Sequence, residues 1–153
     1  MGRGADRIRP VARPNRKNMK EIYRQDSLTG LLNRNAYDSD VEQLRSADIG
    51  AVVCVYADMI GLHEVNNHLG HKQGNRMLCE FADAARAFFG DDRLYRIGGD
   101  EFVIISSAHT EAQTRKQLNY MRERLHTQGC EISVGGSGRA SRPPGICRKS
   151  SET

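Results

Sequence analysis

Long apolar runs are missing from this chain of 153 residues. The longest, Ala51 to Ala57, is far too short to cross a bilayer, and the N-terminus has no apolar core of a secretory signal. Metal-type cysteine spacing is also missing, because the four cysteines form no CxxC pair. The sequence therefore predicts a cytoplasmic protein without a membrane segment, whose cysteines are mostly buried free thiols in a reducing compartment.

Positive charge is concentrated at the two ends of the chain. Residues 1–24 carry eight Lys and Arg against two acidic residues, and residues 137–153 carry four against one. We interpret residues 1–13 as a disordered basic arm, 14–25 as a helical linker, 26–136 as the folded domain and 137–153 as a basic tail. A basic nucleic-acid-binding module is an alternative. The arms lack interleaved aromatic residues, so we expect no specific nucleic-acid partner.

Hydrophobic periodicity within the domain predicts alternating helices and strands. A continuous apolar run rich in valine predicts a buried central strand at residues 50–58. Thr110 and Gln113 match a capping box that opens a helix. The pattern predicts an α/β (α+β) sandwich in which helices cover both faces of one mixed β-sheet. The remaining expected helices are 33–45, 62–68 and 71–89, and a late strand is expected at 131–134.

One stretch combines a tight turn with two carboxylates. The apolar runs Leu94–Ile97 and Phe102–Ile105 flank Gly98-Gly99, and paired glycines tolerate positive φ, so we expect a β-hairpin. Asp100 and Glu101 follow the turn. Both stand at the start of the second strand, and adjacent strand residues point to opposite faces, so we expect the two carboxylates to have different roles. Glycines beside a carboxylate let a phosphate and a divalent metal approach the backbone.

This stretch resembles the signature loop of the GGDEF (diguanylate cyclase) family, and three other segments match the family in the right order. They are Asp-Ser-Leu-Thr-Gly-Leu-Leu-Asn-Arg at 26–34, Asp-Met-Ile-Gly-Leu-His-Glu-Val-Asn-Asn at 58–67 and Gly-His-Lys-Gln-Gly-Asn at 70–75. The resemblance implies the fold shared by nucleotidyl cyclases and polymerase palms. It also implies that the helical linker follows an upstream sensor domain or contacts a partner protein.

The family reaction joins two GTP molecules into cyclic di-GMP and releases pyrophosphate, with Mg²⁺ (or Mn²⁺) as cofactor. By resemblance, Asp58, the backbone carbonyl of Met59 and Asp100 hold the metal, and Glu101 assists the attacking hydroxyl or supports the metal. Such chemistry needs a cation to neutralise phosphate charge. Each active site holds one nucleotide, so the resemblance implies a homodimer.

The same resemblance assigns nucleotide contacts, some of which depart from the family pattern. Asn66 matches the residue that hydrogen-bonds the guanine edge, and the amides of Gly61 and Leu62 match the phosphate contacts. Asn75 stands where an Asp usually reads guanine, and His63 replaces a frequent Lys near the triphosphate. An amide offers donors where guanine also has donors, so Asn75 predicts weakened selection of GTP over ATP.

Two further family features differ. Of the R-x-x-D product-inhibition motif, Asp92 occupies the Asp position but Phe89 the Arg position, so we expect no such inhibitory site. From Ser137 the sequence no longer resembles the family, which implies that a late helix and a closing strand are missing. The sequence thus favours a diguanylate cyclase with an incomplete carboxyl end. The alternative is a degenerate, non-catalytic GGDEF domain that binds nucleotide or a partner.

Overall fold

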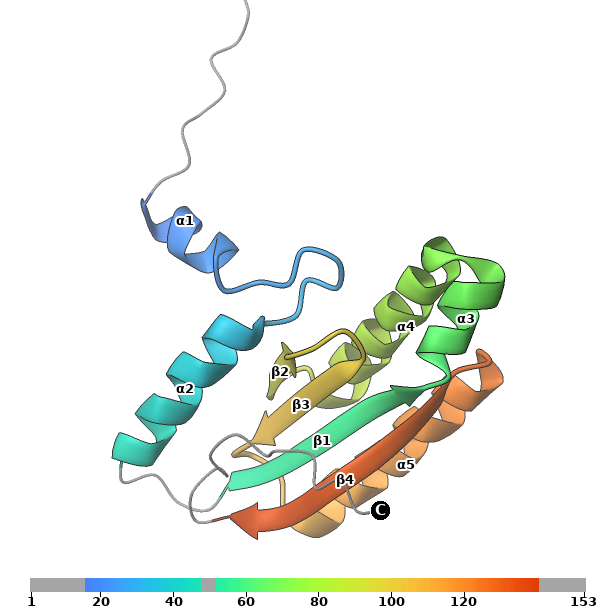
Figure 1. Ribbon diagram of the computed structural model, residues 1–153. Helices are drawn as coiled ribbons and strands as arrows, with labels where there is room; N and C mark the ends of the chain where they lie inside the picture. The colour runs from blue at the N-terminus through green and yellow to red at the C-terminus, as the bar shows by residue number, and fades with distance from the viewer. Residues whose placement is uncertain (1–15, 48–51, 141–153) are drawn as a thin grey trace, which may run out of the picture.

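The structure is a computed structural model that describes residues 16–47 and 52–140. The predicted basic arm, 1–13, and most of the predicted tail lie outside these residues. Four strands form one sheet in the order β2-β3-β1-β4, and every strand ladder is antiparallel. Figure 1 shows helices on both sides of this sheet. The elements in chain order are α1 (Arg16–Ile22), α2 (Arg34–Ser46), β1 (Val52–Ile60), α3 (Leu62–Leu69), α4 (His71–Phe89), β2 (Arg93–Arg96), β3 (Glu101–Ser106), α5 (Glu111–Thr127) and β4 (Glu131–Ala140).

Local side-chain chemistry sets where several helices begin and end. The Asn33 side chain caps α2 by accepting the Ala36 N–H at 2.9 Å. Thr110 and Gln113 form the predicted capping box at the start of α5. Gly129, which follows α5, has a left-handed φ of 78° that favours glycine. The predicted positions of these helices are thus confirmed to within a few residues.

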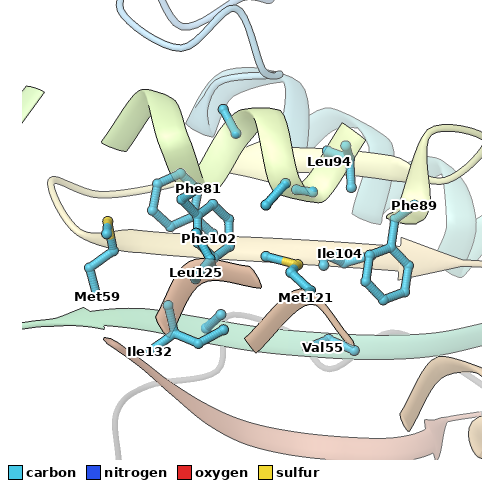
Figure 2. Close-up of a cluster of buried hydrophobic side chains, with 14 of the residues drawn as sticks. Val55, Met59, Phe81, Phe89, Leu94, Phe102, Ile104, Met121, Leu125 and Ile132 are labelled. Carbon is cyan, nitrogen blue, oxygen red and sulfur yellow. The ribbon is translucent and has the colours of Figure 1, made fainter. Parts of the chain in front are cut away.

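The larger core lies between the sheet and helices α4 and α5. Odd-numbered residues of β1, from Val53 to Met59, face this core, as do Phe102 and Ile104 of β3. Figure 2 shows Phe81 of α4 lying on Phe102, with the ring centroids 3.9 Å apart. Burial of such rings is the main driving force for this packing. The strong apolar pattern of β1 therefore fixes this strand at the centre of the domain.

The second core lies on the opposite face of the sheet, under α2. Ala36, Tyr37 and Val41 of α2 pack there with the even-numbered β1 residues Val52 and Cys54. Because side chains alternate along a strand, Tyr56 and Asp58 belong to the same face. Asp58 lies near the opposite end of β1 from Val52 and Cys54. The α2 face therefore has an apolar end and an end that carries a carboxylate.

Three details differ from the sequence prediction. The sheet was expected to be mixed, but its ladders are all antiparallel, and the parallel pairing is an isolated bridge between Leu32 and Tyr95. β4 pairs with β1 as far as Ala140, so it extends four residues into the predicted tail. Its glycine-rich sequence has no alternation that would predict a strand, but backbone hydrogen bonds to β1 do not require one. Linker helix α1 ends at Ile22, three residues before the predicted end at residue 25.

The described helices were also compared with the length and hydropathy that a membrane span requires. Within residues 16–47 and 52–140, no helix is both long and apolar enough to cross a bilayer. Large apolar side chains that are exposed include Ile22 and Tyr23 near the linker helix and Ile60 at the end of β1.

Candidate metal and nucleotide site

Three carboxylates meet where the end of β1 lies beside the β2–β3 hairpin. Oxygen atoms of Asp58, Asp100 and Glu101 all lie within 4.8 Å of one another, and the three residues are half-buried. Asp58 and Glu101 are direct cross-strand partners in the β1–β3 ladder, so their side chains share one face. Hard carboxylate oxygens at this spacing are the donors that Mg²⁺ and Mn²⁺ prefer. The residues present therefore fit the predicted divalent-metal site.

The position of Asp100 corrects the expectation that Asp100 and Glu101 point to opposite faces. β3 begins at Glu101, so Asp100 lies in the turn rather than in the strand. The strict alternation of strand side chains therefore does not apply to this pair. The backbone carbonyl of Asp100 accepts the Met59 N–H at 3.0 Å. This bond ties the turn to β1 and brings Asp100 into the same cluster as Asp58.

The turn itself, residues 97–100, also differs from the prediction. The hairpin is confirmed, but neither Gly98 nor Gly99 has a positive φ. Gly98 is in close contact with Glu101 instead, since a Cβ there would lie 2.8 Å from Oε2 of Glu101. The Glu101 side chain thus folds back over the Gly98 backbone, and a larger residue would displace it. A Cβ at Gly99 would meet nothing within 4 Å.

Arg96 stabilises this turn through hydrogen bonds to its backbone, a role that the sequence analysis missed. Its guanidinium donates to the Gly99 carbonyl through Nη2 at 2.8 Å and Nε at 3.3 Å. Its Nη1 lies 3.2 Å from both carboxylate oxygens of Asp26. The planar fork of arginine suits such simultaneous contacts. Arg96 is therefore a positioning residue for the turn that carries Asp100.

Asp26 is the anchor of this arrangement. It also accepts the Thr29 N–H at 2.8 Å and the Thr29 hydroxyl at 2.7 Å. Partial burial raises the pKa of Asp26, but the Thr29 hydrogen bonds and the Arg96 charge outweigh it, so the pKa lies below its ordinary value of 3.8. The signal for this link was present in the sequence, because Asp26 opens the first motif and Arg96 precedes the paired glycines.

The start of α3 supplies the candidate phosphate contacts. Gly61 precedes α3 with a left-handed φ of 78°, and the first turn has no side-chain cap. Amides at a helix N-terminus attract anions. The N–H of Met59 faces the hairpin, and the N–H and C=O of a strand residue point to the same neighbouring strand, so the Met59 carbonyl is directed there as well. His63 is exposed, and its Nε2 lies 3.1 Å from Nδ2 of Asn67.

The two predicted base-contacting residues lie on adjacent helices. Asn66 of α3 is half-buried, and its side-chain oxygen lies against Gly74 of α4. Asn75, the next residue of α4, is exposed. The structure therefore brings the Asn66 side chain to the α4 turn that carries Asn75. It describes both residues without a nucleotide, so their predicted contacts with the base stay predictions.

The product-inhibition position is occupied by other interactions. Phe89 is 1% exposed and belongs to the core under α4. The Asp92 carboxylate is buried, and its Oδ2 lies 3.0 Å from Nδ1 of His109. Because this carboxylate already has a partner, and because no arginine occupies position 89, the expectation of no inhibitory site stands as a prediction.

Comparison with known proteins identifies the relatives of this chain. Residues 23–148 match the family described as "Diguanylate cyclase, GGDEF domain". The match extends past residue 136, the predicted end of the domain. The chain is 35% identical over 116 residues to the cyclic di-GMP phosphodiesterase PdeB of Shewanella oneidensis, covering 72% of this chain and 13% of that protein. It is also 35% identical over 91 residues to the diguanylate cyclase DgcS of the same organism, covering 57% of this chain and 31% of that protein.

Solved structures agree with this assignment. A microbial GGDEF domain described with cyclic di-GMP is 30% identical, with a TM-score of 0.67 over 76% of this chain and 77% of that one. The diguanylate cyclase SiaD of Pseudomonas aeruginosa, solved with its activator SiaC, is 26% identical, with a TM-score of 0.68 over 76% of this chain and 50% of that one. The chain spans less than a third of the length of the two curated relatives named above.

Proposed function

Because the chain belongs to the GGDEF domain family, we propose that it is a cytoplasmic diguanylate cyclase that condenses two GTP molecules into cyclic di-GMP. The observation that carries this proposal is the cluster of Asp58, Asp100 and Glu101, whose oxygens lie within 4.8 Å of one another. Carboxylates this close repel one another, and a bound divalent cation would relieve that repulsion, which supports a metal-dependent reaction.

In the proposed reaction, the 3′-oxygen of one nucleotide forms a bond to the α-phosphorus of the other. The bond to pyrophosphate breaks, and the same step is repeated in the opposite direction. Asp58 and Asp100 would hold Mg²⁺ (or Mn²⁺), together with the Met59 carbonyl. The bound cation supplies charge neutralisation of the triphosphate and a lower pKa for the attacking hydroxyl.

The other residues bind, orient and accept the proton. Glu101 would take the hydroxyl proton or support the metal ligands, and its position opposite Asp58 in the β1–β3 ladder supports this role. The amides of Gly61 and Leu62 orient the phosphates at the start of α3, beside His63. Asn66 and Asn75 contact the base. Since one chain holds one nucleotide, two copies face each other in a homodimer.

A non-catalytic nucleotide-binding domain is the second candidate. It is favoured by Asn75 and His63, which replace an acidic and a basic residue of the family pattern. Such a domain would bind GTP or cyclic di-GMP, or contact an upstream sensor domain or another protein, without turnover. The intact Gly98-Gly99-Asp100-Glu101 sequence and its close carboxylates support the cyclase instead.

The test is turnover with Mg²⁺ and GTP, then ATP, then both, with products identified by mass. We expect cyclic di-GMP from the wild-type protein and no product from Asp58→Ala or Asp100→Ala. The matched control is Asp83→Ala, which removes an exposed carboxylate of α4 that pairs with Arg86. Turnover retained in either cluster variant would refute the metal assignment. Nucleotide binding without any product would favour the second candidate.

A further inference from the structure

Helix α3 rests on α4 at a buried glycine, Gly74. A Cβ placed on Gly74 would lie 1.8 Å from Oδ1 of Asn66, 2.9 Å from its Cγ and 3.3 Å from Cδ1 of Leu62. No carbon approaches an oxygen to 1.8 Å without a bond. Glycine is therefore the residue that allows the Asn66 side chain its present position.

The same contact defines which part of the Asn66 side chain a ligand can use. Oδ1 is enclosed and has no hydrogen-bond partner among the described residues. An enclosed, unpartnered carbonyl oxygen is unfavourable, so its retention calls for an explanation. With the oxygen held against Gly74, the carboxamide has its two N–H donors left to offer. Adenine and guanine both carry ring-nitrogen acceptors, so these donors suit any purine.

We propose that Gly74 is a positioning residue for base recognition, which keeps the Asn66 carboxamide turned so that it donates to a purine ring nitrogen. This inference rests on the proposed nucleotide-binding function. In this arrangement Asn66 contributes affinity for purines in general. Discrimination between guanine and adenine then falls to the exposed Asn75, the residue after Gly74.

The contact also predicts how the protein responds to a methyl group at this position. The atoms of Asn66 that would clash are the end of its short side chain, which can rotate away from an alanine at position 74. The fold should survive, because alanine is also a better helix former than glycine. Base binding should be weakened, because the rotated carboxamide no longer faces the nucleotide.

The experiment measures binding of non-hydrolysable GTP and ATP analogues with Mg²⁺ by calorimetry, together with thermal unfolding of each variant. We expect Gly74→Ala to weaken both analogues on the order of tenfold, the loss typical of one polar contact in a pocket. The ratio of the two affinities and the Tm should change little. Asn66→Ala should weaken binding to the same extent, and adding Gly74→Ala to it should have no further effect.

The matched control is Gly135→Ala, because a Cβ there meets nothing within 4 Å and the residue does not have a positive φ. Normal binding by Gly74→Ala would overturn this inference alone. So would a loss of folding that persists in the double variant, because the glycine would then serve packing against Leu62. Failure of the wild-type protein to bind either analogue would instead remove the proposed function and this inference with it.

Discussion

Individual side chains connect the first sequence motif to the candidate active site. The Arg96 guanidinium donates hydrogen bonds to the Asp26 carboxylate and to the carbonyl of Gly99, the residue before Asp100. The side chains of Asp26 and Arg96 are less than a fifth exposed, so their ion pair is less screened by solvent than one at the surface. The position of Asp100, one of the candidate metal ligands, therefore depends on a residue about seventy positions earlier in the chain.

This link predicts a pH-dependent contribution to stability. The pKa of Asp26 is lowered in the folded protein, so its ionised form is favoured by folding. The stabilisation is present above the unfolded-state value of 3.8 and is lost as the pH falls through the lower folded-state value. We expect Asp26→Asn to lower the free energy of unfolding at pH 7 by about 1–3 kcal/mol.

The measurement is urea unfolding of wild type and Asp26→Asn between pH 7 and pH 3. The difference between them should shrink below about pH 4, the unfolded-state pKa range of Asp. Asp83→Asn is the control, because its ion pair with Arg86 is exposed and contributes little. A difference that stays constant with pH would show that Asp26 acts through its size and neutral hydrogen bonds.

A second prediction at the residue scale concerns the base. Asn75→Asp restores an acceptor-only side chain, which matches the N1 and N2 donors of guanine and repels the N1 lone pair of adenine. We expect the GTP/ATP ratio of kcat/KM to rise about tenfold or more. Asn119→Asp, at an exposed position of α5, controls for the added charge. An unchanged ratio would show that Asn75 does not read the base.

Among the secondary-structure elements, the helix ends are where local sequence acts most directly. The capping box of α5 satisfies two backbone donors, since Thr110 Oγ1 accepts the Gln113 N–H at 3.2 Å and Gln113 Oε1 accepts the Thr110 N–H at 2.9 Å. α5 supplies Met121 and Leu125 to the main core. A loss of stability at the first turn of α5 should therefore lower the stability of the whole domain.

We predict that Thr110→Ala lowers the free energy of unfolding by about 1 kcal/mol. This corresponds to a fall in Tm of about 3 °C for a domain of this size. Thr127→Ala is the matched control, because the Thr127 hydroxyl donates to the Arg124 carbonyl and caps no N–H group. Equal losses in the two variants would contradict the capping explanation. Differential scanning calorimetry provides the measurement.

The described part of the chain brings three carboxylates together at one end of the sheet. Catalysis in the proposed reaction needs two nucleotides, so activity should depend on association of two chains. We expect the turnover per chain to rise with protein concentration and to level off once the dimer predominates. Activity measured over a hundredfold dilution series, beside sedimentation of the same samples, tests this. A turnover per chain that is constant while the protein is monomeric would contradict the homodimer.

Local patterns in the sequence were enough to predict the family, the helices and the approximate positions of the strands. The valine-rich run of β1, the capping residues and the paired glycines act within a few positions of themselves. The residues of the candidate site were also predictable, since Asp58, Asp100 and Glu101 stand in motifs. The limits of β4 were not predictable, because its last residues pair through the backbone without an alternating pattern.

How these parts meet depends on the packing of the whole domain. The antiparallel register places Asp58 opposite Glu101, and the start of β3 at Glu101 puts Asp100 on the same side as both. Gly74 of α4 makes room for the Asn66 side chain of the neighbouring helix α3. Such contacts join residues of different elements, and their distances follow from packing of the whole domain, which no local pattern contains.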